Sequence, residues 1–182
     1  HSVDKALRSK LFKSIIIVSS IPIKKFKNKS IKVIKGGRER YQSSQNALNF
    51  IKNMNFKNVF IHDAARPNFS IKLLKKLNSN LKKNKAVVPY LTTDNSTKYR
   101  IKNKIQNLNR ENLLFTQTPQ CFNFKSLFNL SKLNNTKITD EATLFLDNNK
   151  KIKFIKGEEN NFKITTKSDL NKINIQNFHG IG

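Results

Sequence analysis

Residues 58–90, NVFIHDAARPNFSIKLLKKLNSNLKKNKAVVPY, contain a strand, a helix and a second strand in succession. The apolar runs 58–62 and 86–90 are short, as in buried strands, whereas the leucines between them recur every three or four residues, as on one face of a helix. Ser70 precedes this helix and is a suitable N-cap residue. The succession predicts an α/β domain with a mostly parallel sheet covered by helices on both faces.

Strands and helices continue to alternate on both sides of this stretch. The apolar strand at 14–20 is predicted to lie centrally in the sheet, and further strands are predicted at 31–34, 152–155 and 162–165. Capping residues and hydrophobic periodicity predict the helices. Their ranges are 1–10, 41–52, 70–83, 124–133, 140–147 with Thr139 as its N-cap, and a last helix opened by Thr166 and Asp169.

Residues 92–109 differ from the rest of the chain. They are polar, show no helical stripe, and alternate weakly at Tyr99, Ile101 and Ile105. Such a segment has no stripe to bury against its own domain. We therefore predict an extended arm or a hairpin that projects from the body.

The charge balance is strongly basic. Lysine and arginine number 36 against 11 acidic residues, which gives a net charge of +25 and is typical of proteins that bind nucleic acids or anionic membranes. However, only six of the basic residues are arginine, the better fork for bases and phosphates, and the lysines are spread along every segment. Codons rich in adenine and thymine favour the same composition. We attribute the charge to this bias, and nucleic-acid binding is the less favoured alternative.

Length and cysteine content narrow the class of protein. A chain of 182 residues suits one domain. Its longest apolar run, residues 15–18, is much shorter than the ~20 residues that cross a bilayer. Because Cys121 is the single cysteine, an internal disulfide and a cysteine-rich metal site are excluded. We expect no membrane partner and a cytoplasmic location.

The best candidate for a functional site follows the strand at 58–62. Asp63 stands at the carboxyl end of this strand, where ligands bind in parallel sheets and where a metal and phosphates would meet. Ala64 is small enough for a ligand to approach the backbone, and Arg66 offers a two-pronged donor for phosphate. An equally open alternative is that Asp63 and Arg66 form a loop-stabilising ion pair while His62 packs in the core.

Other polar residues stand at the ends of predicted elements. Gly37 lies in a Gly-Gly turn before a helix, where glycine permits close approach and the helix N-terminus attracts anions. Thr118 lies in a proline-containing segment, Thr139 at a helix start and Lys163 in a strand-like run. Each has a simpler interpretation as a turn, a cap or a solvated lysine. Cys121 has no neighbouring base, which favours a packed thiol over a nucleophile.

Taken in chain order, these segments resemble the motifs of the 2-C-methyl-D-erythritol 4-phosphate cytidylyltransferase family. The matching segments are GGxxRxxS at 36–43, HDAARP at 62–67, TPQxF at 118–122, ITDEA at 138–142 and NxKIT at 161–165. The resemblance covers residues 1–177, and HDAARP and TDEA are its most specific parts. It implies a Rossmann-like three-layer nucleotidyltransferase fold in which residues 92–109 form the projecting β-arm.

The resemblance also implies a function. Members of the family transfer the cytidylyl group of CTP to 2-C-methyl-D-erythritol 4-phosphate, called methylerythritol phosphate below, and release pyrophosphate in isoprenoid synthesis. It implies Mg²⁺ as cofactor, held by Asp63, and a homodimer in which the arm of one subunit reaches the active site of the other. We retain two alternatives: a cytidylyltransferase for another sugar-alcohol phosphate, such as ribitol 5-phosphate, and a basic nucleic-acid-binding module.

Matching positions imply further site residues. Arg110 and Lys163 correspond to the catalytic basic residues that position the methylerythritol phosphate. The expected substrate-binding residues are Arg66, Ser96, Thr97, Thr118 and Thr139. The expected CTP-binding residues are Gly37, Arg38, Ser43 and Ala64. In the arm the family has Asp-Thr-x-Lys, whereas residues 94–98 read DNSTK, so either Ser96 or Thr97 supplies the expected hydroxyl.

The sequence departs from the family at its two ends. The family opens with a strand and a glycine-rich loop whose basic residues stabilise the triphosphate, and the segment that starts at His1 does not contain them. We therefore expect the cytidylyltransferase domain, residues 1–177, to be N-terminally incomplete and inactive on its own. Residues 178–182 resemble the opening of 2-C-methyl-D-erythritol 2,4-cyclodiphosphate synthase. They are expected to be either a tail or the start of a fused second domain.

Overall fold

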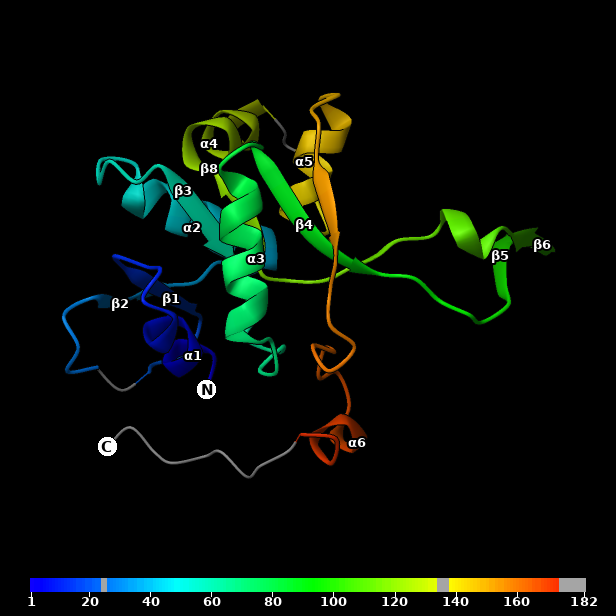
Figure 1. Cartoon of the computed structure of the whole chain (residues 1–182), viewed down its shortest axis with the longest axis horizontal. Coiled ribbons are helices and arrows are strands. Elements are labelled where there is room, and N and C mark those ends of the chain that lie inside the picture. The colour runs from blue at the N-terminus through cyan, green and yellow to red at the C-terminus, as the bar shows by residue number, and fades with distance from the viewer. Residues whose placement is uncertain (24–25, 134–137, 174–182) are drawn as a thin grey trace.

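The structure is a computed structural model that describes residues 1–23, 26–133 and 138–173 (Figure 1). Its helices are α1 (Ser2–Ser9), α2 (Arg40–Ile51), α3 (Ile71–Leu81), α4 (Phe124–Leu133), α5 (Glu141–Asp147) and α6 (Lys167–Leu170), with a 3₁₀ turn at Arg110–Asn112. Its strands are β1 (Ile15–Ser19), β2 (Ile31–Lys35), β3 (Asn58–Ile61), β4 (Ala86–Leu91), β5 (Thr97–Ile101), β6 (Lys104–Leu108), β7 (Phe115–Thr116), β8 (Gln120–Asn123) and β9 (Lys153–Lys156). The alternation of helices and strands confirms the α/β class.

The main sheet contains β3, β8, β4, β7 and β9. β8 lies between β3 and β4 and pairs antiparallel with both, while β9 pairs parallel with β4. β3, β4 and β9 therefore run in one direction, as the sequence predicts. The antiparallel pairings of β7 and β8 were not predicted. They arise because the chain returns from the arm without the crossover helix that parallel pairing requires.

β1 and β2 form a separate parallel pair, with Ile15 opposite Ile31 and Ser19 opposite Lys35. Among the described residues β1 pairs with β2 alone, so the prediction of a central strand at 14–20 is wrong. Its residues are only half-buried, because the strand packs against α2 on one face. Ile16 still contributes to the hydrophobic core.

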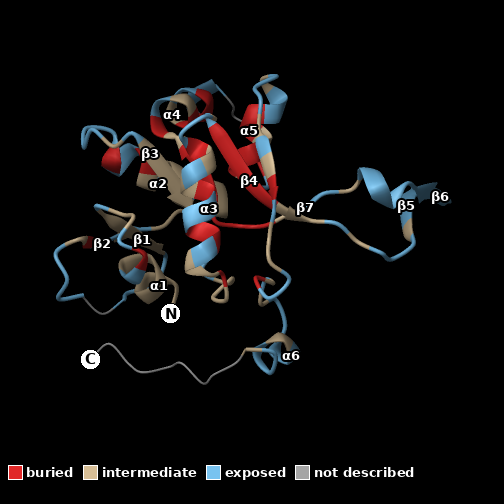
Figure 2. Cartoon of the chain, in the orientation of Figure 1, coloured by how far each residue is buried: buried red, intermediate tan, exposed pale blue. Residues whose placement is uncertain are grey.

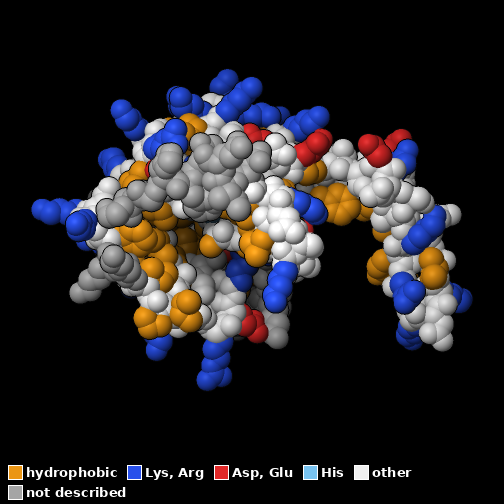
Figure 3. Space-filling view, turned by 90° about the horizontal axis from the view of Figure 1, so that it is seen from below, with side chains coloured by type: hydrophobic (Ala, Val, Ile, Leu, Met, Phe, Trp, Pro, Cys, Tyr) orange, Lys and Arg blue, Asp and Glu red, His pale blue; other side chains and the backbone are white. Residues whose placement is uncertain are grey.

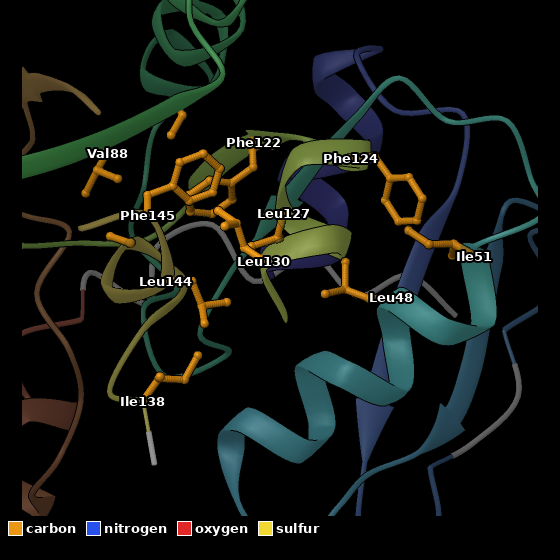
Figure 4. Close-up of a cluster of buried hydrophobic side chains, with 12 residues drawn as sticks. Leu48, Ile51, Val88, Phe122, Phe124, Leu127, Leu130, Ile138, Leu144 and Phe145 are labelled. Atoms are coloured by element: carbon orange, nitrogen blue, oxygen red, sulfur yellow. The ribbon is translucent and has the colours of Figure 1, made fainter. Parts of the chain in front are cut away.

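Side chains of the main sheet alternate between two hydrophobic cores, as expected of a sheet covered on both faces. Val87 and Cys121 pack with the leucines of α3. Val88 and Phe122 belong to the opposite core, whose side chains Figure 4 shows. There Phe122 stacks on Phe145 of α5 with ring centroids 5.2 Å apart. The two cores place α3, with α1 packed against it, on one face and α2, α4 and α5 on the other.

The α3 helix follows its sequence prediction closely. Ser70 caps it, because the Ser70 hydroxyl accepts a hydrogen bond from the Leu73 amide at 2.9 Å. The predicted inner face is buried and consists of Leu73, Leu74, Leu77 and Leu81. Complete burial of one leucine stabilises a fold by about 1.5–3 kcal/mol. This stripe fixes α3 against the sheet and so positions the loop at 62–67 that precedes it.

The predicted arm is a hairpin of β5 and β6, with Thr97 opposite Leu108 and Ile101 opposite Lys104. It projects from the body (Figure 1), and its residues are largely exposed (Figure 2). Tyr99 and Ile101 lie on the face of the hairpin that Leu108 also occupies, and they are 50% and 46% exposed. The arm thus presents apolar side chains that its own subunit does not cover.

Three local predictions need correction. Asp140, and not Thr139, is the N-cap of α5, since its carboxylate accepts from the Thr143 amide at 3.1 Å. The predicted strand at 162–165 does not pair with any strand among the described residues, and its Ile164 amide instead donates to the Ala65 carbonyl at 2.8 Å. The strand β8 was missed. The expected tail or second-domain start at 178–182 lies outside the described residues.

Candidate active site

Asp63 lies two residues after the last residue of β3, at the carboxyl end of the strand, as predicted. Its Oδ1 accepts a hydrogen bond from Arg40 Nε at 2.8 Å, and its Oδ2 lies 3.4 Å from Lys163 Nζ. The Asp63 side chain is 16% exposed. The start of α2, the loop after β3 and the segment after β9 therefore meet at one carboxylate.

Arg40 links Asp63 to α5. Its Nη1 and Nη2 donate to Oε1 and Oε2 of Glu141 at 3.0 and 2.8 Å. Glu141 is the first residue of α5 and is 1% exposed. A two-pronged, charge-assisted pair of this kind fixes orientation as well as distance. The starts of two helices are thereby tied to the loop that carries Asp63.

Charges in this cluster compensate one another. Burial by itself would raise the pKa of Asp63, but the hydrogen bond and charge of Arg40, with the charge of Lys163, hold that pKa below its ordinary value. Burial also opposes the charge of Arg40, yet Glu141 and Asp63 raise the Arg40 pKa. Asp63 and Arg40 are therefore ionised at neutral pH.

A second set of hydrogen bonds holds the backbone of Asp63. The Asp63 amide donates to Thr118 Oγ1 at 3.0 Å, and Thr118 Oγ1 lies 3.1 Å from His62 Nδ1. The Arg66 carbonyl beside Nε2 can only accept, so the ring proton lies on Nε2, and Nδ1 of the neutral ring accepts from the Thr118 hydroxyl. Nε2 lies 3.0 Å from the Arg66 carbonyl and donates to it. Thr118, predicted to bind substrate, is buried here as a support for Asp63.

Arg66 connects the loops around the site. Its Nη1 donates to the Asn161 carbonyl at 2.9 Å and its Nη2 to the Thr116 carbonyl at 3.4 Å. The alternative interpretation, an ion pair between Asp63 and Arg66, is not supported, because the cations in contact with Asp63 are Arg40 and Lys163. The role of Arg66 in phosphate binding stays a prediction.

Three predicted CTP-binding residues lie at the start of α2. The Gly37 amide donates to Ser43 Oγ at 3.1 Å, and the Arg38 amide donates to Gln42 Oε1 at 2.8 Å. A Cβ atom on Gly37 would lie 2.2 Å from Gln42 Cβ, so no other residue fits at this turn. The predicted nucleotide-binding turn and Arg40 therefore belong to the same helix start.

The remaining predicted residues fall into two groups. Ala64 is exposed in the turn after Asp63, and Thr139 is exposed at the start of α5. Ala64 is next to Asp63 in the chain, and Thr139 is two residues before Glu141. A second group lies on or beside the arm, which stands away from the body of its own chain (Figure 1). This group consists of Ser96, Thr97 and Arg110.

Sequence reasoning missed Arg40 and Glu141 as members of the site, although both stand inside the quoted motifs. Glu141 shares the buried part of α5 with Ala142, Leu144 and Phe145. An acidic residue among buried positions needs a partner, because an unpaired buried charge is very costly. That signal would have pointed to a buried cation opposite α5.

The distribution of basic residues and the burial of Cys121 agree with the interpretations of a compositional charge bias and a packed thiol. Lysines and arginines are spread around the outline of the face in Figure 3 and do not gather in one patch. Cys121 is fully buried, and burial raises the pKa of its thiol, so it is packed and unreactive. In the described part of the chain, none of the helices has the length and apolar character needed to cross a membrane.

Comparison with known proteins places this chain among the nucleotidyltransferases. A sequence model of the family described as 2-C-methyl-D-erythritol 4-phosphate cytidylyltransferase (IspD) matches residues 1–176. The chain therefore belongs to this family, which confirms the resemblance found in its motifs.

Three relatives illustrate the match. The chain is 49% identical to a bifunctional enzyme IspD/IspF of Pelagibacter ubique, over all of this chain and 50% of that protein. It is 34% identical to a 2-C-methyl-D-erythritol 4-phosphate cytidylyltransferase of Thermosipho melanesiensis, over 99% and 85% of the two chains. The crystal structure of the Francisella tularensis enzyme aligns with a TM-score of 0.82 and 30% identity, over 93% and 83%. The chain thus spans half of the bifunctional relative.

Proposed function

We propose that this chain transfers the cytidylyl group of CTP to methylerythritol phosphate and releases pyrophosphate, as a step of isoprenoid synthesis. The observation that carries the proposal is the family match over residues 1–176. The meeting of Asp63, Arg40 and Lys163 at the end of β3 supports it, since this is where ligands bind in such sheets.

The proposed reaction is an attack by an oxygen of the acceptor phosphate on the α-phosphorus of CTP. Such a transfer needs alignment and compensation of negative charge more than covalent help from the protein. Lys163 suits the acceptor phosphate, because its side chain is 44% exposed and its contact with Asp63 is long. Arg66 borders the same loops. Both cations would reduce the repulsion between the acceptor dianion and the triphosphate.

The nucleotide is proposed to lie over the start of α2 and the turn after Asp63. Backbone amides at a helix N-terminus favour anionic ligands, and Gly37 allows close approach. Arg38, Ser43 and Ala64 complete the proposed CTP contacts. Thr118 would act through Asp63, which it supports, and Thr139 would contribute its exposed hydroxyl at the start of α5.

Mg²⁺ is the proposed cofactor, with Asp63 as its protein ligand. Magnesium sites that act on nucleotides often use one or two carboxylates, with phosphate oxygens and water as the other ligands. Asp63 fits this pattern, because among the described residues the ion-pair partner of its Oδ2 is a half-exposed lysine at 3.4 Å. The described residues contain no cluster of three His, Cys, Asp or Glu side chains for a metal. Bound Mg²⁺ would neutralise triphosphate charge.

A homodimer formed through the arm is proposed as the active assembly. Exposed Tyr99, Ile101 and Leu108 on one hairpin face favour a protein partner, since exposed apolar faces commonly mark interaction surfaces. Arg110, with Ser96 or Thr97, would then serve the site of the partner subunit. We also propose a cytoplasmic location, which suits a chain whose single cysteine is free, and a cyclodiphosphate synthase fusion, which the bifunctional relative supports.

A pyrophosphate-release assay tests the proposed function. The longest product of the same gene that contains these 182 residues is mixed with CTP, Mg²⁺ and either methylerythritol phosphate or ribitol 5-phosphate. We expect release that depends on methylerythritol phosphate and is lost in the matched Asp63→Asn variant. Release with ribitol 5-phosphate alone would favour the other sugar-alcohol enzyme, and absence of release with either acceptor would contradict the proposal.

A further inference from the structure

Arg40 was not among the predicted site residues, yet three of its nitrogens are bonded inside the site. Nε donates to Asp63, and the two terminal nitrogens donate to Glu141. The Arg40 side chain is 30% exposed, whereas Glu141 is 1% exposed. Glu141 therefore holds Arg40 from inside the protein, whereas Asp63, at the other end of these contacts, faces the site.

We infer that Arg40 is a positioning residue of the proposed reaction, in which Glu141 fixes the guanidinium and the guanidinium fixes the Asp63 carboxylate. The inference rests on the proposed function. With Oδ1 committed to Arg40, the carboxylate keeps one orientation, and Oδ2 is directed to Lys163. Residues that orient a ligand-binding group in this way commonly change affinity or activity about 10- to 100-fold when removed.

The two cations at Asp63 differ in a way that supports separate roles. Arg40 is held at both ends, with contacts of 2.8 Å to Asp63 and 2.8–3.0 Å to Glu141. Lys163 is half-exposed and contacts Asp63 at 3.4 Å. Arg40 is thus a fixed part of the site, whereas Lys163 can exchange Asp63 for an incoming phosphate.

Proton exchange at Arg40 Nε tests, without any ligand, whether Glu141 fixes the Arg40 guanidinium against Asp63. The chain has six arginines, so their Nε–H signals can be assigned individually in ¹⁵N-edited NMR spectra. We expect Arg40 Nε–H to exchange slowly in the wild type and at least about tenfold faster in Glu141→Gln. Arg66 is the matched control, since its Nε is buried, has no hydrogen-bond partner within the part of the chain that the structure describes, and should be unaffected. Equal Arg40 exchange in both proteins would overturn the inference.

Glu141→Asp gives the same comparison if the glutamine variant does not fold. It keeps the charge and withdraws the carboxylate from the guanidinium. Faster Arg40 Nε–H exchange in this variant supports the inference that Glu141 fixes Arg40, and unchanged exchange counts against it.

A double-mutant cycle tests the catalytic consequence. Arg40→Gln/Glu141→Gln leaves no lone charge in the core, so it is the variant in which folding is easiest to preserve. We expect kcat to fall about 10- to 100-fold with the KM for CTP changed less than about twofold. Glu141→Gln should add nothing once Arg40 is glutamine.

A purely structural role would give a different pattern, in which the KM for CTP rises and stability falls. The effects of Arg40→Gln and Glu141→Gln would then add in the double variant. That pattern would contradict the inference even if the assay itself succeeds. A wild-type protein without turnover would instead contradict the proposed function. The exchange measurement would still show whether Glu141 fixes Arg40.

Discussion

The imidazole of His62 lies between the Thr118 hydroxyl and the Arg66 carbonyl and packs edge-on against Phe69. Burial lowers its pKa from the ordinary 6.5 to about 4, although the Asp63 charge opposes the shift. The hydrogen bonds around it are complete with the neutral ring and its proton on Nε2. Protonation would remove the acceptor for Thr118, and through Thr118 it would disturb the Asp63 backbone.

The free energy of unfolding should therefore depend on pH through His62. Below pH 6.5 the unfolded chain binds a proton that the folded chain refuses until about pH 4, so stability is highest above 6.5 and falls as the pH drops through this window. Between pH 7 and pH 4.5 the expected loss is about 2–3 kcal/mol. Urea denaturation at the two pH values measures it. A His62→Gln variant should lose less by about this amount, and an equal loss would show that His62 is not responsible.

Lys163 is expected to align the acceptor and not to bind CTP. Its 3.4 Å contact with Asp63 and its 44% exposure place a solvent-accessible cation beside the carboxylate. Lys163→Ala should reduce turnover by about 10²-fold or more, as does the loss of other groups that stabilise a transferred charge. CTP affinity, measured by isothermal titration, should remain nearly unchanged. Lys167→Ala on α6 serves as the matched control, and a collapse of CTP affinity in Lys163→Ala would refute the assignment.

At the residue scale the sequence could identify Asp63 because a polar residue directly after a buried strand marks the ligand-binding edge of a sheet. It could not identify the partner of Asp63. Arg66 is three residues away and was the obvious candidate, whereas Arg40 is 23 residues away and reaches Asp63 only through the fold. Pairings between distant side chains depend on packing, which a local pattern does not encode.

Among the elements, α3 provides the clearest test of the core. Leu77 is fully buried in its inner face. Leu77→Ala should reduce the free energy of unfolding by about 2–5 kcal/mol, because it removes apolar contact and leaves a cavity. Leu146→Ala on α5 is the matched control, since Leu146 is 55% exposed and its loss should cost little. Chemical denaturation of both variants measures the difference, and equal costs would contradict the packing of α3.

The arm should act on the partner subunit. Arg110→Ala and Lys163→Ala subunits should each be impaired alone, yet a mixed dimer should recover part of the activity, because one of its two sites carries both groups. The measurement is turnover by purified heterodimers carrying two different tags. An absence of recovery in verified heterodimers would count against a site shared between subunits.

Elements were predictable where one local pattern decided them. The leucine stripe of α3 and its Ser70 cap are such patterns, and both are confirmed. β8 was missed because buried Gln120 looks polar in sequence, whereas in the structure its side chain is bonded to Asp140 and to the Ala142 amide. The segment at 162–165 has a strand-like sequence, but no sheet edge receives it. Whether a segment pairs with another strand depends on residues far away in the sequence, which a local pattern does not contain.

Across the whole molecule, three loops are tied together beneath the site. Gln117 donates to the carbonyls of Glu158 and Asn161 at 2.8 and 3.2 Å, and Asn161 donates to the Thr118 carbonyl at 2.8 Å. Arg66 adds its bonds to Thr116 and Asn161. Lys163 is two residues from Asn161, so these contacts fix the position of its backbone relative to Asp63. The fold thereby joins residues that are about 100 positions apart in sequence.

The central claim is that the acceptor phosphate attacks CTP at this site, and oxygen labelling tests it most directly. Methylerythritol phosphate labelled with oxygen-18 in its phosphate is incubated with CTP and the protein, and the products are analysed by ³¹P NMR. The account predicts labelled oxygen in the bridge of the diphosphate product, unlabelled pyrophosphate, and no product with Asp63→Asn. Label in the released pyrophosphate, or product formed equally by the variant, would contradict it.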